Sequence, residues 1–277
     1  MTSASILVLL AIASVCSVEA IIRPGYGGGK GHHHEDCSDE HHYQPHPPKK
    51  TSTVAATTPE VTMTPEATTT PEATTPRMEY VCESGWTRYQ RTPSAYNQNT
   101  GFWCMKLVTS DTTITINAGS QLCQNEGGVL TAYENEAERT AITALAQAHI
   151  VGSLGLARGS IAFAGSKIAA CESKDAAVRA SALCNNRTAI MTLPASASTN
   201  PDYLWTTWAD LEPNNGYWTY DYESCLQFHI APADALQHAL INDFYCVFDK
   251  APNTQTDTLY YNFGALCGQA PGLQALG

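Results

Sequence analysis

The chain has 277 residues, enough for one large domain or two modest ones. Its formal net charge of −11 at pH 7 argues against a nucleic-acid partner, because phosphate binding requires clustered Lys and Arg. Acidity is compatible with a cation site, although acidic surfaces are mostly a matter of solubility.

Residues 1–20 have the features of a secretory signal peptide. Ile6–Ala13 is a short apolar run, and Val18-Glu-Ala20 places small residues at the cleavage positions. The run is too short to span a bilayer, and a buried strand would not need a cleavage-like ending. We therefore expect a secreted, extracellular protein without membrane insertion, in which the cysteines form disulfides.

Two low-complexity segments follow the signal peptide. Residues 21–50 are rich in Gly and His, cannot bury enough apolar surface to fold, and form either a loose tail or a zinc or copper site. We favour the tail. Residues 51–77 contain three six-residue repeats that begin at Thr58, Thr64 and Thr70. This Thr/Pro density is typical of an O-glycosylated, mucin-like stalk, or of a plain linker, before a folded domain at 78–277.

Helical patterns occur twice in the first half of that domain. Asn117–Gly128 predicts a short helix that ends at a Gly pair, and Val129–Leu130 predicts a brief strand. Glu134–Ala148 predicts a second helix, whose first turn is acidic and therefore favours the helix dipole. The following residues recur at i+4 on one face of that helix: Ala137, Ala141 and Leu145.

The second half contains fewer local signals. Cys225–Ile230 alternates like a half-buried strand. Asn186-Arg-Thr188 is an N-glycosylation acceptor sequence, which predicts an exposed loop. The isolated histidines have no recognisable nucleophile or base partner, so we expect no enzymatic activity. They are His149, His229 and His238.

Three short segments carry a concentrated set of oxygen-bearing side chains. Trp208–Gly216 contains Glu212-Pro-Asn214, Glu223 lies two residues before Cys225, and Asn242-Asp243 lies shortly before Cys246. Carboxylate and amide oxygens are the ligands that Ca²⁺ prefers. A cis bond before Pro213 would turn Glu212 and Asn214 toward one ion.

This order of motifs, with the final Cys267-Gly, resembles the C-type lectin-like domain. Cys82-Glu-Ser-Gly-Trp86 also resembles the start of the long form of that domain, and Ile161–Gly165 takes the place of its core strand. The resemblance implies an α+β fold with two helices, small antiparallel sheets and a long calcium-binding loop region. It also implies four disulfides: Cys82–Cys104, Cys123–Cys267, Cys171–Cys184 and Cys225–Cys246.

The same resemblance implies a calcium-dependent lectin. The implied Ca²⁺ ligands are Glu212, Asn214, Glu223, Asn242 and Asp243. The first four of these would also contact the sugar, and the Glu-Pro-Asn order goes with mannose, N-acetylglucosamine or fucose. Ile241 stands where the family usually has Trp. The alternative is a calcium-independent protein-interaction or structural module on the same fold.

The cysteine count also predicts an oligomer. Ten cysteines less Cys16 of the signal peptide leave nine, and eight of these fall between Cys82 and Cys267. Cys37 is left over in the N-terminal tail. We therefore expect a homodimer joined through Cys37.

Overall fold

The computed structural model describes residues 77–218, 221–248 and 257–276. The signal peptide, the tail with Cys37 and the stalk lie outside these residues. The helical elements are α1 (Ile116–Asn125), α2 (Glu136–Gln147), the π-helical turn η1 (Ala148–Ser153), α3 (Ala176–Arg179) and the short 3₁₀ turns Ala169–Cys171, Ala195–Ala197, Leu204–Thr206 and Thr258–Tyr260.

One large sheet organises the described strands. Its strands are β2 (Thr87–Gln90), β3 (Phe102–Ile114), β4 (Val129–Leu130), β5 (Gly159–Lys167), β6 (Met191–Thr192), β9 (Cys225–Ile230), β10 (Ile241–Phe244) and β11 (Asn262–Gln269). The main order is β10-β9-β5-β11-β3-β2, with β4 beside β11 and β6 beside β5. Its pairs are antiparallel except β5–β11, which is parallel.

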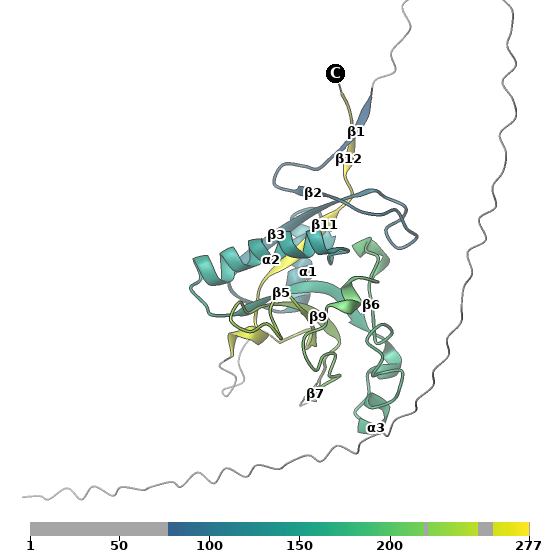
Figure 1. The fold of residues 1–277 in the computed structure, drawn as a ribbon, viewed down its shortest axis with the longest axis vertical. Coiled ribbons are helices and arrows are strands. Elements are labelled where there is room, and N and C mark those ends of the chain that lie inside the picture. The colour runs from purple at the N-terminus through teal and green to yellow at the C-terminus, as the bar shows by residue number, and fades with distance from the viewer. Residues whose placement is uncertain (1–76, 219–220, 249–256, 277) are drawn as a thin grey trace, which may run out of the picture. The chain divides into compact units, whose positions relative to one another are not determined.

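Two small ribbons lie at opposite ends of the domain in Figure 1. β1 (Met78–Val81) pairs with β12 (Gly272–Ala275) and brings the first and last described strands together. β7 (Tyr217–Trp218) pairs with β8 (Asp221–Tyr222) within the long loops at the other end. The Glu-Pro-Asn segment leads into β7, and Glu223 directly follows β8.

Helix α1 begins one residue before the predicted Asn117 and ends at Asn125, with the predicted Gly pair just beyond its end. The Thr115 hydroxyl accepts a hydrogen bond from the N–H of Ala118, which satisfies a free donor of the first turn. Gly127 has φ +81°, a left-handed conformation that glycine adopts without steric cost. The Gly128 N–H then donates to the carbonyl of Cys123 and closes the helix.

Helix α2 forms as predicted, but its predicted apolar face is not the buried one. Asn135 caps the helix by accepting from the N–H of Glu138. The buried residues are Glu138, Ile142 and Ala146, whereas Leu145 is 49% exposed. The face of Ile142 is the buried one because Ile142 supplies the larger apolar surface. Glu138 is buried by its ion pair with Arg91 (2.8 Å), which the sequence pattern does not reveal.

The two helices cover opposite faces of the sheet. Alternate strand residues such as Ile161 and Phe163 pack with Ile142 of α2, while Ala162 packs with Ile116 of α1. All six residues of β9 are therefore buried, so its prediction as a half-buried strand was wrong. A sheet covered on both faces buries both sets of side chains.

Four disulfides staple the described domain. They join Cys82 to Cys104, Cys123 to Cys267, Cys171 to Cys184 and Cys225 to Cys246. These are the four pairs that the resemblance implied. In the described part of the chain, no helix combines the length and the hydropathy that a membrane crossing needs.

Candidate functional site

The Glu-Pro-Asn loop is attached to the start of β10. The N–H of Ala209 donates to the carbonyl of Ile241, and the N–H of Ile241 donates to Thr207, both at 2.9 Å. Trp208 is buried and donates its ring N–H to the carbonyl of Arg187. These contacts bring the loop beside Asn242-Asp243, which are distant in the sequence.

Three consecutive backbone N–H groups in this loop donate hydrogen bonds to three carboxylates. The Glu212–Pro213 bond is cis, and the N–H of Asn214 donates to Glu212 Oε2 (2.8 Å) and Asp243 Oδ1 (3.2 Å). The N–H of Asn215 donates to Asp243 Oδ2 (3.2 Å), and that of Gly216 donates to Glu223 Oε2 (2.6 Å). A Cβ at Gly216 would overlap the Glu223 carboxylate, so only glycine allows this approach.

Burial and mutual repulsion disfavour ionisation of these three carboxyl groups. Desolvation raises the pKa of Glu212 and of Glu223, and the nearby charge of Asp243 raises both further. Burial also raises the pKa of Asp243, against the opposing effect of Lys167. A cation bound among them would relieve both the desolvation and the repulsion.

The structure adds two residues to this cluster that the sequence analysis missed. Lys167 ends β5, and its ammonium lies 2.6 Å from Asn215 Oδ1 and 3.3 Å from Asp243 Oδ2. Asn215 also donates through Nδ2 to the carbonyl of Arg179. A lone lysine ending an apolar strand was the available signal, because a buried ammonium needs an oxygen partner.

Hydrogen bonds connect only some of the five predicted ligands to one another. Hydrogen bonds within the loop unite Glu212, Asn214, Asp243 and, through Gly216, Glu223. No described contact joins the Asn242 side chain to these carboxylates. Its Oδ1 is buried and has no hydrogen-bond partner. Asn214 is exposed and Glu212 half-buried, whereas Glu223, Asn242 and Asp243 are buried.

Aromatic side chains flank the cluster. Trp218 is 49% exposed and contacts Tyr245, with ring centroids 6.3 Å apart. Tyr217 packs on Tyr222 at 5.2 Å, and the Arg179 guanidinium lies over the Tyr217 ring. Tyr217 therefore packs locally, while Trp218 stays about half exposed.

An α+β domain with helices on both sheet faces, a disulfide from α1 to β11 and a cis Glu-Pro-Asn loop defines a C-type lectin-like domain. The chain belongs to the family described as C-type lectin domain-containing protein 141/158, whose model matches residues 88–270.

Two relatives come from Caenorhabditis elegans. C-type lectin domain-containing protein 141 is 41% identical over 205 residues, which cover 69% of this chain and 66% of that protein. The chain thus spans just under two thirds of that relative's length. C-type lectin domain-containing protein 158 is 34% identical over 190 residues, which cover 69% of this chain and 89% of that protein. Among solved structures, a calcium-independent type II antifreeze protein aligns with 19% identity and a TM-score of 0.39, over 70% of this chain and 98% of its own.

Proposed function

We propose that this chain is a calcium-dependent lectin, a binding module and not an enzyme. The observation that carries the proposal is the convergence of Glu212, Glu223 and Asp243 on one backbone run, Asn214–Gly216. Three mutually repelling carboxylates with one ammonium beside them form a cluster that attracts a divalent cation. The donor chemistry suits a hard cation such as Ca²⁺, because every proposed ligand atom is an oxygen.

The proposed Ca²⁺ ligands are the oxygens of Glu212, Asn214, Glu223, Asn242 and Asp243. The Asn242 carboxamide fits this assignment because its oxygen is buried with no hydrogen-bond partner, which is costly unless a ligand satisfies it. The backbone N–H groups of the loop hold the carboxylates in place before the ion arrives. The two disulfides that flank the site, Cys171–Cys184 and Cys225–Cys246, support the loop ends.

The proposed sugar contacts are Glu212, Asn214, Glu223 and Asn242. Bound Ca²⁺ supplies open coordination places for two adjacent sugar hydroxyls. The half-buried Glu212 and the exposed Asn214 provide one acceptor carboxylate and one donor amide beside them. Glu223 and Asn242 form the buried pair. By resemblance, the Glu-Pro-Asn order goes with mannose-type sugars, namely mannose, N-acetylglucosamine and fucose.

The disulfides of the domain fit an oxidising compartment, so we place this lectin outside the cell. Asn186 is exposed, as an N-glycosylation acceptor must be, and we propose that it carries a glycan. A second candidate function is a calcium-independent interaction module on the same fold. The contact of Lys167 with Asp243 favours it, because this ammonium already pairs with one of the proposed ligands.

Thermal unfolding of the full secreted chain in EDTA and in Ca²⁺ tests the proposal. At a calcium concentration about 100 times Kd, binding should stabilise the native state by about 2.7 kcal/mol and raise Tm by several degrees. Retention on immobilised mannose should require Ca²⁺, and free mannose should elute the protein more effectively than galactose.

Glu223→Gln removes one ligand charge and should weaken calcium binding by at least about tenfold. The matched control is Glu83→Gln, which changes an exposed carboxylate of the N-terminal segment and should behave as wild type. A wild type with the same Tm in EDTA and in saturating Ca²⁺ would contradict the lectin proposal and favour the calcium-independent module.

A further inference from the structure

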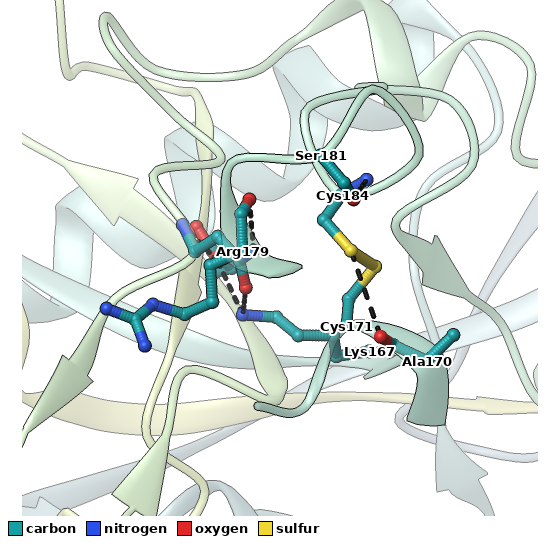
Figure 2. The surroundings of a disulfide bond; sticks show 8 residues. Lys167, Ala170, Cys171, Arg179, Ser181 and Cys184 are labelled. Atoms are coloured by element: carbon teal, nitrogen blue, oxygen red, sulfur yellow. Dashed lines mark hydrogen bonds and ion pairs between the residues drawn. A yellow bond between two sulfur atoms is a disulfide. The ribbon is translucent and has the colours of Figure 1, made fainter. Parts of the chain in front are cut away.

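Lys167 connects the large sheet to the candidate calcium loop. Its backbone is fixed at the end of β5, where its N–H donates to Ser224 and its residue pairs with Met191 of β6. Its side chain is fully buried. Figure 2 shows this side chain reaching from the strand end, beside the Cys171–Cys184 disulfide, to the oxygens that it bonds.

The amide of Asn215 is held from both sides. Its Oδ1 accepts from Lys167 Nζ (2.6 Å), and its Nδ2 donates to the Arg179 carbonyl (3.0 Å). Asn215 is 2% exposed and has φ +58°, the left-handed region that asparagine tolerates better than most residues. Its backbone N–H in turn binds Asp243. Lys167 therefore fixes the loop residue that orients Asp243, and it also contacts Asp243 directly.

The charges of the cluster add a second argument. Ionised Glu212, Glu223 and Asp243 carry three negative charges, and the described ion pairs bring one ammonium, that of Lys167, to them. The remainder of two negative charges is the amount that one divalent cation cancels. Burying an unpaired charge is costly, so a neutral loaded site is favoured over a charged one.

We propose that Lys167 is the resident cation of this site, a positioning residue that keeps Asp243 and Asn215 in place when calcium is absent. The inference rests on the proposed calcium function and deepens it. Lys167 neutralises one of the three negative charges, and the two that remain match the charge of one Ca²⁺. It also preserves the loop conformation when no ion is bound. Without Lys167, no ammonium among the described ion pairs faces the buried Asp243 in the empty site.

Lys167→Met tests this role, because methionine keeps an unbranched buried side chain and removes the charge. Tm of the full chain is measured in EDTA and in saturating Ca²⁺. Lys167→Met should lower Tm much more in EDTA than in Ca²⁺, so the calcium-induced rise should be roughly twice that of wild type, since the ion then offsets more unpaired charge. Lys174→Met is the control, because Lys174 is exposed in the loop that the Cys171–Cys184 disulfide closes, and it should leave the rise unchanged.

Two further variants separate charge from packing. Lys167→Arg keeps the charge and should keep the wild-type calcium-induced rise, even where its larger side chain lowers both Tm values. Lys167→Met combined with Asp243→Asn removes both charges and should unfold in EDTA at a higher temperature than Lys167→Met alone. If Lys167→Met does not fold in EDTA, a folded double variant under the same conditions gives the same result.

Two results would overturn the role of Lys167, provided that the wild type responds to calcium. The first is that Lys167→Met lowers Tm equally in EDTA and in Ca²⁺. The second is that the double variant unfolds in EDTA at no higher temperature than Lys167→Met. A wild type that does not respond to calcium would instead overturn the proposed function and this inference together.

Discussion

His229 lies in β9 with 1% of its surface exposed, and both of its ring nitrogens have partners. Nδ1 is 2.9 Å from Gln237 Oε1, so it donates, and Nε2 is 3.1 Å from Gln227 Nε2, so it accepts. This pattern suits the neutral imidazole. Burial lowers the pKa of His229 to about 4, against a smaller raising effect of the Gln237 hydrogen bond and of Asp257. His229 is thus a packed, hydrogen-bonded residue of the sheet, and none of these contacts is with a catalytic partner.

The lowered pKa makes a prediction about acid stability. Between the unfolded-state pKa of about 6.5 and the folded-state value of about 4, the unfolded chain binds a proton at His229 and the native chain does not. The contribution of His229 to the free energy of unfolding is therefore complete above pH 6.5 and is lost as the pH falls to 4. We expect wild type to lose about 3 kcal/mol more unfolding free energy than His229→Gln between pH 7 and pH 4. Urea unfolding at several pH values measures this difference, and parallel curves for the two proteins would contradict it.

At the scale of elements, the approach of α1 to the sheet depends on small residues. Gly119 faces Ala162 of β5 and Ala265 of β11, and a Cβ added to it would lie 2.9 Å from the Ala162 Cβ and 3.1 Å from the Ala265 Cβ. These neighbours are the first side-chain atoms on two central strands, so they cannot rotate away. The Cys123–Cys267 disulfide ties α1 to β11 at the same interface. The spacing of this layer is therefore set by glycine and alanine.

Gly119→Ala should destabilise the domain by about 1–3 kcal/mol, because the added methyl overpacks a layer that cannot widen. Gly152→Ala is a matched control, since a Cβ there meets nothing within 4 Å in the π-helical turn η1. Its expected effect is neutral or a stabilisation of up to about 1 kcal/mol, as for alanine in an exposed helix. Chemical unfolding of both variants measures the effects. Equal effects of the two substitutions would show that the α1 interface is not close-packed.

At the scale of the whole molecule, all eight cysteines from Cys82 onward are paired within the domain. Cys37 lies outside the described residues, as do the expected signal peptide and stalk. An unpaired cysteine in an oxidising compartment is a candidate for an intermolecular bond. Two domains joined through their tails would raise the avidity of the proposed sugar binding through effective concentration.

We therefore predict that the secreted chain runs as a disulfide-linked dimer on a non-reducing gel. Cys37→Ser should run as a monomer, and reduction should convert wild type to the same mobility. Thiols are blocked with an alkylating agent before denaturation, so that the disulfides of the domain cannot exchange. Identical non-reducing mobility of wild type and Cys37→Ser would exclude the dimer through Cys37.

Much of the fold could be predicted because its signals are local or chemically distinctive. The glycine stop of α1 lies within a dozen residues of the helix start, and the oxygen-bearing side chains of the Glu-Pro-Asn loop are recognised by residue type alone. The buried face of α2 was not predictable in this way. It depends on Arg91, a residue far away in the chain, which makes burial of Glu138 favourable.

The sequence by itself determined the two helices, the loop motif and which side chains carry oxygen ligands, because these depend on residue type, spacing and order. The α+β class followed from the resemblance of its motifs to the C-type lectin-like domain. Only the tertiary structure decided that β9 is covered on both faces, that the buried Asn242 Oδ1 has no hydrogen-bond partner, and that Lys167 enters the cluster. Burial and ion pairing depend on which distant segments meet. A lysine at the end of a strand has the same local sequence whether its ammonium faces water or a buried carboxylate, and only the packed fold distinguishes the two.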